Sequence, residues 1–499
     1  MNFLPRTPVI VGVGEVVDRP EFVDHAKEPL VLMAEALRRA SEDSGVPILR
    51  EVESLDVVNS TSWGYANLPR QLSCMLGISP KRQEYGEIGG DTPVRYLHDA
   101  AVRVAQGELE CAAVCGAESA QSVFSAEKSR KRLPWIEGSP KPSGPKREGI
   151  IHPLALRFGL DRPLTVYPLY EYATRAAWDQ SFAEAQAETG EIYSQFSGVA
   201  QENVYAWDRR FCTPSDILTP SSDNRLVSGP YTKRMVANPR VNQGAAVIVT
   251  SFAKAKAIGI LEDRLVYVWG GAAAHEHADF VSRSQYKRSL AMETALNAAK
   301  QLCGANQREL ELVELYSCFP CIPKMARRIV DWPLFKSATI TGGLSFFGGP
   351  YNNYMTHAAS AMTRELRRRK QHVGLLYGLG GFATKHHSLI LASTPPVSQV
   401  RPGYLLAASG GHFSGEVPRI DESFAGDARL ETYTVLYDRE GTADRAVVFA
   451  RTDEQSRVLA QVDRSNARTL DLLTSSSANM IGQVGRISLN ADRTLNWQF

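Results

Sequence analysis

The chain has 499 residues, of which 43% are hydrophobic and 22% charged, and its formal net charge is +2. This length is greater than a single hydrophobic core usually supports, so it indicates two or three domains. The near-neutral charge excludes a general attraction to nucleic acid or to an anionic membrane, and no apolar run is long enough to cross a bilayer. The first residues, "MNFLPRTPVIVGVGEVV", have the pattern of a core strand rather than of a signal peptide. Seven scattered cysteines indicate reduced thiols in the cytoplasm rather than a disulfide framework.

The first 120 residues alternate between strand and helix patterns. "PVIVGV" (8–13) predicts a buried strand, and 28–45 has the apolar spacing of a helix that ends at Gly45. Residues 54–61 predict another strand, and 85–119 predict a strand, a tight turn, a helix and a strand. Thr92 is expected to cap that helix, with Pro93 at its first position.

The same alternation returns after a polar, irregular insertion at about 120–245. The later pattern predicts a strand, a helix that begins at Ser289 and ends at Gly304, a second helix and a strand hairpin around "GLGG", at 264–274, 289–304, 356–370 and 372–393. The repetition indicates two α/β halves whose sheets are covered by helices on both sides. After the proline-containing stretch 393–404 the pattern changes to short alternating strands, which predicts a separate small β domain at 400–499.

Cys318 and Cys321 lie in a C-x-x-C spacing within "ELYSCFPCIP" (314–323). Such a pair is a redox couple, half of a metal site, or one useful cysteine with a neighbour. A zinc ribbon requires a second C-x-x-C, and the other close pair, Cys111 and Cys115, has a different spacing. The two histidines of "HEH" (275–277) lie on opposite faces of an extended segment, which does not favour a metal site. A buried apolar cysteine remains the common alternative.

Two glycine-rich turns offer free backbone amides. "GGDTP" (89–93) stands at the start of a predicted helix, where amides and the helix dipole suit an oxyanion or a polarised carbonyl. "GLGG" (378–381) offers a second set. A simple tight turn explains either motif equally well.

The order of these segments resembles the thiolase superfamily, in particular the sterol-carrier-protein thiolases and the mycobacterial-type thiolase-like proteins of type 1. The resemblance covers about residues 7–393 and is carried by the motifs "TPVIVGVGE", "QGELECAAVCGAES", "PYTKRMVANPRVNQGAAVIVTS", "VELYSCFP", "GGLSFFGGP" and "GLGGFATKHHS". It implies a five-layered α-β-α-β-α core of two similar halves at 1–120 and 246–395, with an inserted loop domain at 121–245. The β domain at 400–499 resembles the OB-like domain appended to type 1 proteins.

Carried over residue by residue, the resemblance implies a depleted catalytic site. The family's nucleophilic cysteine falls on Gly90, and its Asn or His falls on Tyr316. The family's Gly-His-Pro motif falls on Gly348, Gly349 and Pro350, so the activating histidine is absent, and its second cysteine motif falls on Gly378–Gly380. His357 is a candidate partial substitute for the histidine. Cys318 matches the acid/base cysteine of the sterol-carrier-protein thiolases.

These departures bear directly on catalysis. Thiolase chemistry needs a nucleophile, a base that activates it, a second acid/base and oxyanion holes for two carbonyls. The amides of Gly90 and Gly380 are expected to survive as oxyanion-hole donors, and Cys318 as the one thiol. Ordinary thiolase activity is not expected, because losing the nucleophile removes several orders of magnitude in turnover.

The resemblance predicts coenzyme A or an acyl-CoA as ligand, with no tightly bound cofactor and no metal. Gly349 and the basic side chains of the insertion are candidates for contact with CoA, namely Lys128, Arg130, Lys131 and Arg132, with Lys141, Lys146 and Arg147 beyond them. A solvated basic loop is the alternative for each cation. The β domain has few aromatic and many acidic residues, so it is expected to extend the pocket or recruit a protein partner rather than bind nucleic acid.

Three hypotheses follow. The protein is an atypical acyltransferase of the acetyl-CoA acetyltransferase kind, a non-catalytic acyl-CoA or lipid-binding protein, or a scaffold that needs a partner. The resemblance to the type 1 proteins also predicts a monomer.

Overall fold

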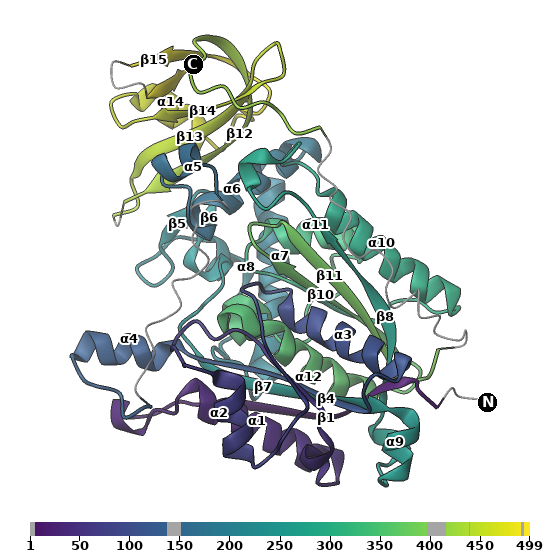
Figure 1. Cartoon of the computed structure of the whole chain (residues 1–499). Helices are drawn as coiled ribbons and strands as arrows, with labels where there is room; N and C mark the ends of the chain where they lie inside the picture. The colour runs from purple at the N-terminus through teal and green to yellow at the C-terminus, as the bar shows by residue number, and fades with distance from the viewer. Residues whose placement is uncertain (1–4, 137–150, 397–415, 439, 491–493) are drawn as a thin grey trace.

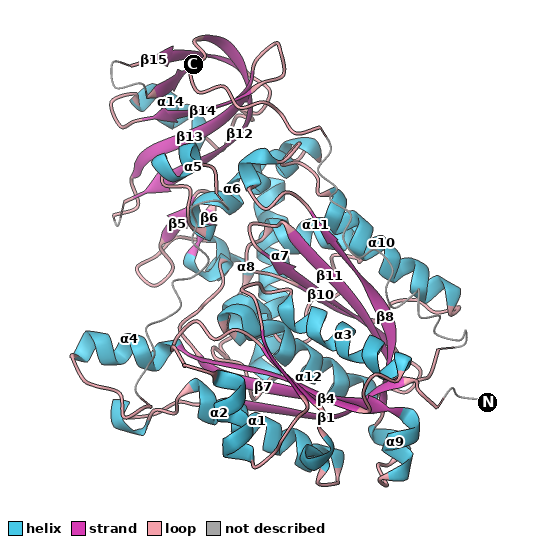
Figure 2. Cartoon of the chain, viewed as in Figure 1, coloured by secondary structure: helices cyan, strands magenta, loops and turns pink. Residues whose placement is uncertain are grey.

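The structure is a computed structural model that describes residues 5–136, 151–396, 416–438, 440–490 and 494–499. Its centre is a nine-stranded mixed sheet in the order β3-β2-β4-β7-β1-β8-β11-β10-β9 (Figures 1 and 2). The first five strands of this order are β3 (Arg82–Tyr85), β2 (Ser54–Val57), β4 (Cys111–Ser119), β7 (Asn242–Ser251) and β1 (Pro8–Val17). The remaining four are β8 (Val266–His275), β11 (Lys385–Ala392), β10 (Val373–Gly380) and β9 (Leu312–Leu315). The two groups are joined where Val9 and Ile10 of β1 pair with β8.

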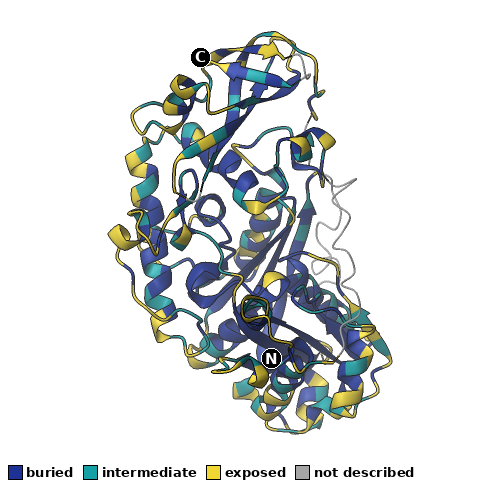
Figure 3. Cartoon of the chain, turned by 90° about the vertical axis from the view of Figure 1, so that its left-hand side faces the viewer, coloured by how far each residue is buried: buried dark blue, intermediate teal, exposed yellow. Residues whose placement is uncertain are grey.

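Helices form three further layers around the two groups of strands. Between them lie α3 (Thr92–Gln106) and α12 (Tyr354–Arg368), and each contacts strands of both groups (Figure 1). The outer face of the first group is covered by α1 (Pro29–Ser44) and α2 (Leu68–Leu76). The outer face of the second group is covered by α10 (Leu290–Ala305) and α11 (Cys321–Ile329). The short helix α9 (Phe252–Ala257) directly follows β7. Buried residues run through both groups and the central helices (Figure 3).

The local chemistry of the chain explains these elements. In α1 the apolar residues recur at helical spacing and face β1, and the helix ends at Gly45, whose φ of 80° suits glycine. Close approach of α1 to β1 requires Gly14, because a Cβ there would lie 2.7 Å from the backbone nitrogen of Ala40. The neighbouring Glu15 points to the other face of the strand, toward α12.

The segment predicted as an irregular insertion is largely helical. It contains α4 (Ala120–Ser129), α5 (Pro153–Arg157), α6 (Pro163–Ala177), α7 (Phe182–Glu202) and α8 (Pro214–Leu218), with the short strands β5 (Leu226–Ser228) and β6 (Tyr231–Thr232). The helices were not predicted because α6 buries Glu171, Thr174 and Arg175 beside its apolar residues. These polar residues conceal the apolar periodicity from which a helix is read.

The C-terminal segment forms a closed barrel in the order β12-β13-β14-β16-β15. Its elements are β12 (Gly426–Tyr437), β13 (Ala443–Arg451), β14 (Arg457–Val462), helix α14 (Ala467–Thr474), β15 (Val484–Leu489) and β16 (Leu495–Gln498). The barrel packs on α6, where the rings of Tyr172 and Tyr433 stack with centroids 4.0 Å apart. No helix in the described ranges is long and apolar enough to cross a membrane.

Three predicted boundaries differ from the structure by one to a few residues. Asp91 rather than Thr92 occupies the N-cap of α3, so Pro93 is the second helical residue. Gly304 lies inside the last turn of α10, which is closed by Asn306. The "GLGG" segment mostly belongs to β10, and the hairpin turn follows it before β11 begins at Lys385.

Candidate functional site

The two glycine turns meet at the start of α3. Gly90 precedes the helix and Gly380 ends β10, and a Cβ placed on Gly378 would lie 3.1 Å from the Cα of Asp91 and 3.4 Å from the carbonyl oxygen of Gly90. The turn before α3 is held from the side of α12, because the Gly89 amide donates to Oδ1 of Asn352 at 2.9 Å. The structure therefore brings Gly90 and Gly380 together, although they are far apart in the chain.

The space beside Gly90 is filled by Tyr316. A Cβ on Gly90 would lie 2.6 Å from both Cζ of Tyr316 and the carbonyl oxygen of Leu379, and closer still to the Tyr316 hydroxyl. Real Cβ atoms essentially never make such contacts, so no side chain fits at Gly90 while Tyr316 keeps this position. Tyr316 is held in turn by the ring of Tyr354, which it meets edge to face at 5.9 Å.

The space beside Gly380 is filled by Asp91. A Cβ on Gly380 would overlap Oδ1 of Asp91. This carboxyl group is buried, and Oδ1 has no hydrogen-bond partner among the described residues. Burial raises the pKa of Asp91, and the nearby Lys385 only partly opposes that shift. Asp91 is part of "GGDTP" in the sequence, but its packing over Gly380 depends on tertiary structure.

Cys318 and Cys321 are both buried free thiols. Burial raises the pKa of Cys318 to about 12, although a hydrogen bond with Tyr167 acts in the opposite direction. Cys321 opens α11, with its Sγ 3.8 Å from the carbonyl oxygen of Tyr167, and burial raises its pKa further. Both thiols are therefore protonated at neutral pH. In the parts of the chain that the structure describes, no group of three or more His, Cys, Asp or Glu side chains could hold a metal ion.

His357 belongs to a buried ionic cluster on α12. Its Nδ1 lies 2.6 Å from Oε1 of Glu15, whose other oxygen pairs with Arg364, and its ring meets Phe347 edge-on at 5.1 Å. Burial opposes ionisation of Glu15, but Arg364 and His357 outweigh it and lower the pKa of that carboxyl. These contacts tie α12 to β1, which gives His357 a structural explanation.

Gly349 stands where the thiolase-like motif would carry a histidine. Its amide donates to the carbonyl oxygen of Asn238 at 2.8 Å, and a Cβ there would lie 3.4 Å from that oxygen and from Cβ of Ala237. Gly349 is thus packed against the segment that precedes β7.

Comparisons with known proteins bear on the fold. A family model described as the thiolase-like protein type 1 additional C-terminal domain matches residues 414–492. The crystal structure of a monomeric SCP2-thiolase-like protein type 1 from Mycobacterium smegmatis is 27% identical, covers 100% of both chains and has a TM-score of 0.82. The chain is thus similar to a thiolase-like protein of type 1 over its whole length, and its C-terminal domain matches the domain model of that family. The predicted thiolase fold with a C-terminal β domain is confirmed.

More distant solved structures share the fold alone. Human mitochondrial 3-ketoacyl-CoA thiolase in complex with CoA is 15% identical, with a TM-score of 0.57, over 79% of this chain and 99% of that chain. Acat5 thiolase from Ascaris suum in complex with coenzyme A is 14% identical, with a TM-score of 0.54, over 77% and 99%. A comparison with curated proteins found no match.

The basic residues of the insertion lie at the end of α4 and just after it. Lys128 is in the last turn of α4, and Arg130, Lys131 and Arg132 follow it, all exposed. Lys141, Lys146 and Arg147 lie outside the described residues. Two pockets, of about 1120 and 230 Å³, open elsewhere on the molecule, and neither is lined by Gly90, Cys318 or Gly380.

Proposed function

We propose that this protein uses the thiolase fold to bind an acyl-CoA or a related thioester and does not perform the thiolase reaction. The observation that carries the proposal is the contact of Tyr316 with Gly90. It leaves no nucleophile and no space for one at the start of α3. Without a group to hold the acyl chain covalently, the two-step reaction has no first step.

The thioester ligand is supported by the fold and by exposed cations. Two structures with this fold are described as complexes with coenzyme A. The exposed cations Lys128, Arg130, Lys131 and Arg132 suit the phosphates of CoA. Entry of an acyl group between Gly90 and Gly380 requires Tyr316 and Asp91 to move aside. We also propose that the domains divide at 1–120, 121–245, 246–395 and 400–499. We propose a cytoplasmic location for the protein.

An atypical acyltransferase is the competing proposal, with Cys318 as acid/base and the amides of Gly90 and Gly380 as oxyanion donors. The thiol is buried and its pKa is about 12, so it does not supply a thiolate at neutral pH. The absence of a thiolate at Cys318 favours the binding role over the catalytic one.

Calorimetric titration tests the proposal. The purified protein and its Cys318→Ala variant are titrated with CoA, acetyl-CoA, a long-chain acyl-CoA and a steroidal acyl-CoA, and acyl exchange is assayed alongside. We expect micromolar binding of one thioester, equal in both proteins, without exchange. Exchange that disappears in the variant would favour the acyltransferase, and the absence of all binding would exclude a thioester ligand.

A scaffold role is the second candidate function, because the barrel and the core enclose the larger pocket between them. The relative from Mycobacterium smegmatis is described as monomeric. We infer that this chain is also a monomer, which would leave its surfaces open to a different protein.

A further inference from the structure

Four lysine or arginine residues are buried in the part of the chain that the structure describes, and three of them pair with a carboxylate. The three pairs are Lys324 with Glu171, Arg457 with Glu431, and Arg283 with Glu276. The fourth residue is Arg175 of α6, which is 4% exposed. Its Nε has no hydrogen-bond partner among the described residues, and none of their carboxylates forms an ion pair with it. A buried charge without a counter-charge is costly, so this arginine requires an explanation.

The carboxylates closest to Arg175 along the chain do not neutralise it. Glu171 lies one helical turn earlier, but its two oxygens interact with Lys324 at 2.7 Å and with the Tyr231 hydroxyl at 3.0 Å. Asp179 lies one turn later, is exposed, and follows the end of α6. Arg175 therefore adds an excess positive charge to the interior.

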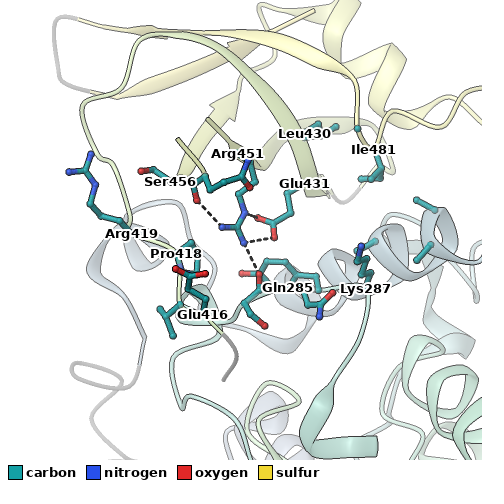
Figure 4. Close-up of a pocket in the computed structure, with 18 of the residues that line it drawn as sticks. Gln285, Lys287, Glu416, Pro418, Arg419, Leu430, Glu431, Arg451, Ser456 and Ile481 are labelled. Atoms are coloured by element: carbon teal, nitrogen blue, oxygen red, sulfur yellow. Dashed lines mark hydrogen bonds and ion pairs between the residues drawn. The ribbon is translucent and has the colours of Figure 1, made fainter. Parts of the chain in front are cut away.

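The large pocket at the junction of barrel and core does not reach this arginine. Arg175 is not among the residues that line the pocket (Figure 4). Three basic and three acidic residues line it, and Arg451 pairs there with Glu431 at 3.0 Å. The charge of Arg175 is therefore not neutralised from the pocket.

The immediate neighbours of the guanidinium are aromatic residues. Its Cζ lies 5.4 Å from the ring centroid of Tyr172 and 5.8 Å from that of Phe182. It also donates a hydrogen bond to the hydroxyl of Tyr433, whose ring stacks on Tyr172. A guanidinium has five N–H donors, and one tyrosine oxygen cannot accept from all of them. The rings offset part of the cost of burial but leave donors without an acceptor.

Hydroxyl groups of α6, β5 and β12 gather at the contact of the barrel with α6. Gly229 directly follows β5, and a Cβ there would lie 2.9 Å from the Tyr172 hydroxyl and 3.2 Å from the Tyr437 hydroxyl. Ser228 in β5 and Thr434 in β12 each bury a hydroxyl group that has no hydrogen-bond partner within the described ranges. Because α6, β5 and β12 contact one another, these unsatisfied polar atoms indicate a bound water or ion.

We propose that Arg175 binds a small inorganic anion such as chloride beneath the barrel, where α6, β5 and β12 meet. The Nε group would donate to the anion, and the hydroxyl groups of Tyr433 and Ser228 would donate from the two strands. A water molecule would satisfy the hydroxyl groups, but only an anion also neutralises the buried charge. The anion would fasten the barrel to α6, and this role does not depend on thioester binding in the core.

Thermal unfolding in different salts tests the proposal. The full-length protein is dialysed into sodium gluconate, and chloride then replaces gluconate stepwise at constant ionic strength. We expect the unfolding midpoint to rise by about 2 °C or more and to saturate, because the anion binds the native state. Arg175→Met, which places an apolar side chain of similar length there, should show no dependence on chloride.

Two milder variants keep the test decisive if Arg175→Met does not fold. Tyr433→Phe keeps the stacked ring and removes one hydroxyl group, so the chloride concentration at half-saturation should increase about tenfold. Tyr96→Phe is the matched control, since it removes a buried hydroxyl group from α3, which also lacks a partner among the described residues. The control should keep the dependence of the wild type.

Bromide locates the anion. Crystals of the wild type soaked in sodium bromide should show an anomalous scattering peak within hydrogen-bond distance of Nε of Arg175. A midpoint that does not change with chloride, together with water in place of bromide at Arg175, would overturn the proposal. A chloride dependence that persists unchanged in Arg175→Met or in Tyr433→Phe, or bromide bound only elsewhere, would also overturn it.

Discussion

At the scale of single residues, other side chains occupy the space beside the two glycines of the candidate site: Tyr316 lies beside Gly90, and Asp91 lies beside Gly380. The sequence alone predicts that Gly90 carries no nucleophile and that Tyr316 replaces a smaller polar residue. It does not predict that these two residues touch, because they belong to β-α turns of opposite halves and meet only in the folded chain. The same holds for Asp91 and Gly380.

Restoring the cysteine alone is therefore expected to fail. Gly90→Cys should lower the free energy of unfolding by about 1–3 kcal/mol, because the new side chain collides with Tyr316 and the Leu379 backbone, and thiolase activity should stay absent. Gly304→Cys is the matched control, since a Cβ at Gly304 meets open space. Urea unfolding of both variants measures the difference. Equal stability of Gly90→Cys and the wild type would show that Tyr316 moves freely.

The thiols should react according to their burial. Cys74 is exposed, whereas Cys318 is buried with a pKa of about 12, so iodoacetamide at pH 8 should modify Cys74 and leave Cys318 intact. Peptide mass spectrometry gives the modified positions, and Cys318 should become reactive once the protein is unfolded in guanidinium. Modification of Cys318 in the native protein at the rate of Cys74 would instead indicate a catalytic thiol.

At the scale of elements, β9 is anchored by a buried carboxyl group. Glu314 accepts hydrogen bonds from the backbone amides of Ile340 and Thr341 and from the Tyr354 hydroxyl, at 3.0, 3.2 and 2.6 Å. It therefore connects β9 to the loop that precedes α12 and to the helix itself. Burial raises the pKa of Glu314 to about 6, and these hydrogen bonds only partly oppose the shift.

This pKa makes part of the stability depend on pH. A carboxyl whose folded pKa exceeds its unfolded value of 4.5 contributes most below pH 4.5, and that contribution is lost as pH rises through about 6. The loss corresponds to about 2 kcal/mol. Urea midpoints between pH 4.5 and 7 should show this slope, and Glu314→Gln should flatten it. An unchanged slope in the variant would assign the effect to another group, of which Asp91 is the first to test.

The elements also show where sequence patterns are sufficient. Strong apolar periodicity located α1, α10 and α12 to within a few residues, because these helices cover sheets with one clear apolar face. The helices of the insertion were missed since they bury ionic pairs such as Lys324 with Glu171 at 2.7 Å. The two charges of such a pair neutralise each other only in the folded chain. In the sequence the same residues look like charged surface residues.

At the scale of the whole molecule, the barrel is attached to the core by a buried arginine. Arg457 of β14 is fully buried, pairs with Glu431 and donates to the carbonyl oxygens of Val281 and Arg283 in the loop before α10. The sequence indicated a separate β domain, but this contact joins residues that are distant in the chain. The barrel is therefore a fixed part of the molecule.

Removing this anchor should release the barrel. Arg457→Met leaves two buried carbonyl groups without a donor and part of the charge of Glu431 unpaired, which should destabilise the native state by about 3–5 kcal/mol. Calorimetry should then show a separate early transition for the barrel. Arg486→Met serves as control, because Arg486 pairs with Asp427 on the exposed barrel surface and should contribute less than about 1 kcal/mol. A single unshifted transition in Arg457→Met would mean that other contacts hold the barrel.

The contact between Tyr316 and Gly90 also restricts how such a protein can evolve. A mutation that returns a thiol to position 90 is harmful as long as Tyr316 is present, and loss of the buried Tyr316 ring leaves a cavity that gives no benefit until the thiol is there. Each step is disfavoured without the other. Selection acting on one substitution at a time would therefore keep descendants of this chain away from thiolase chemistry, even though the surrounding fold remains able to house it.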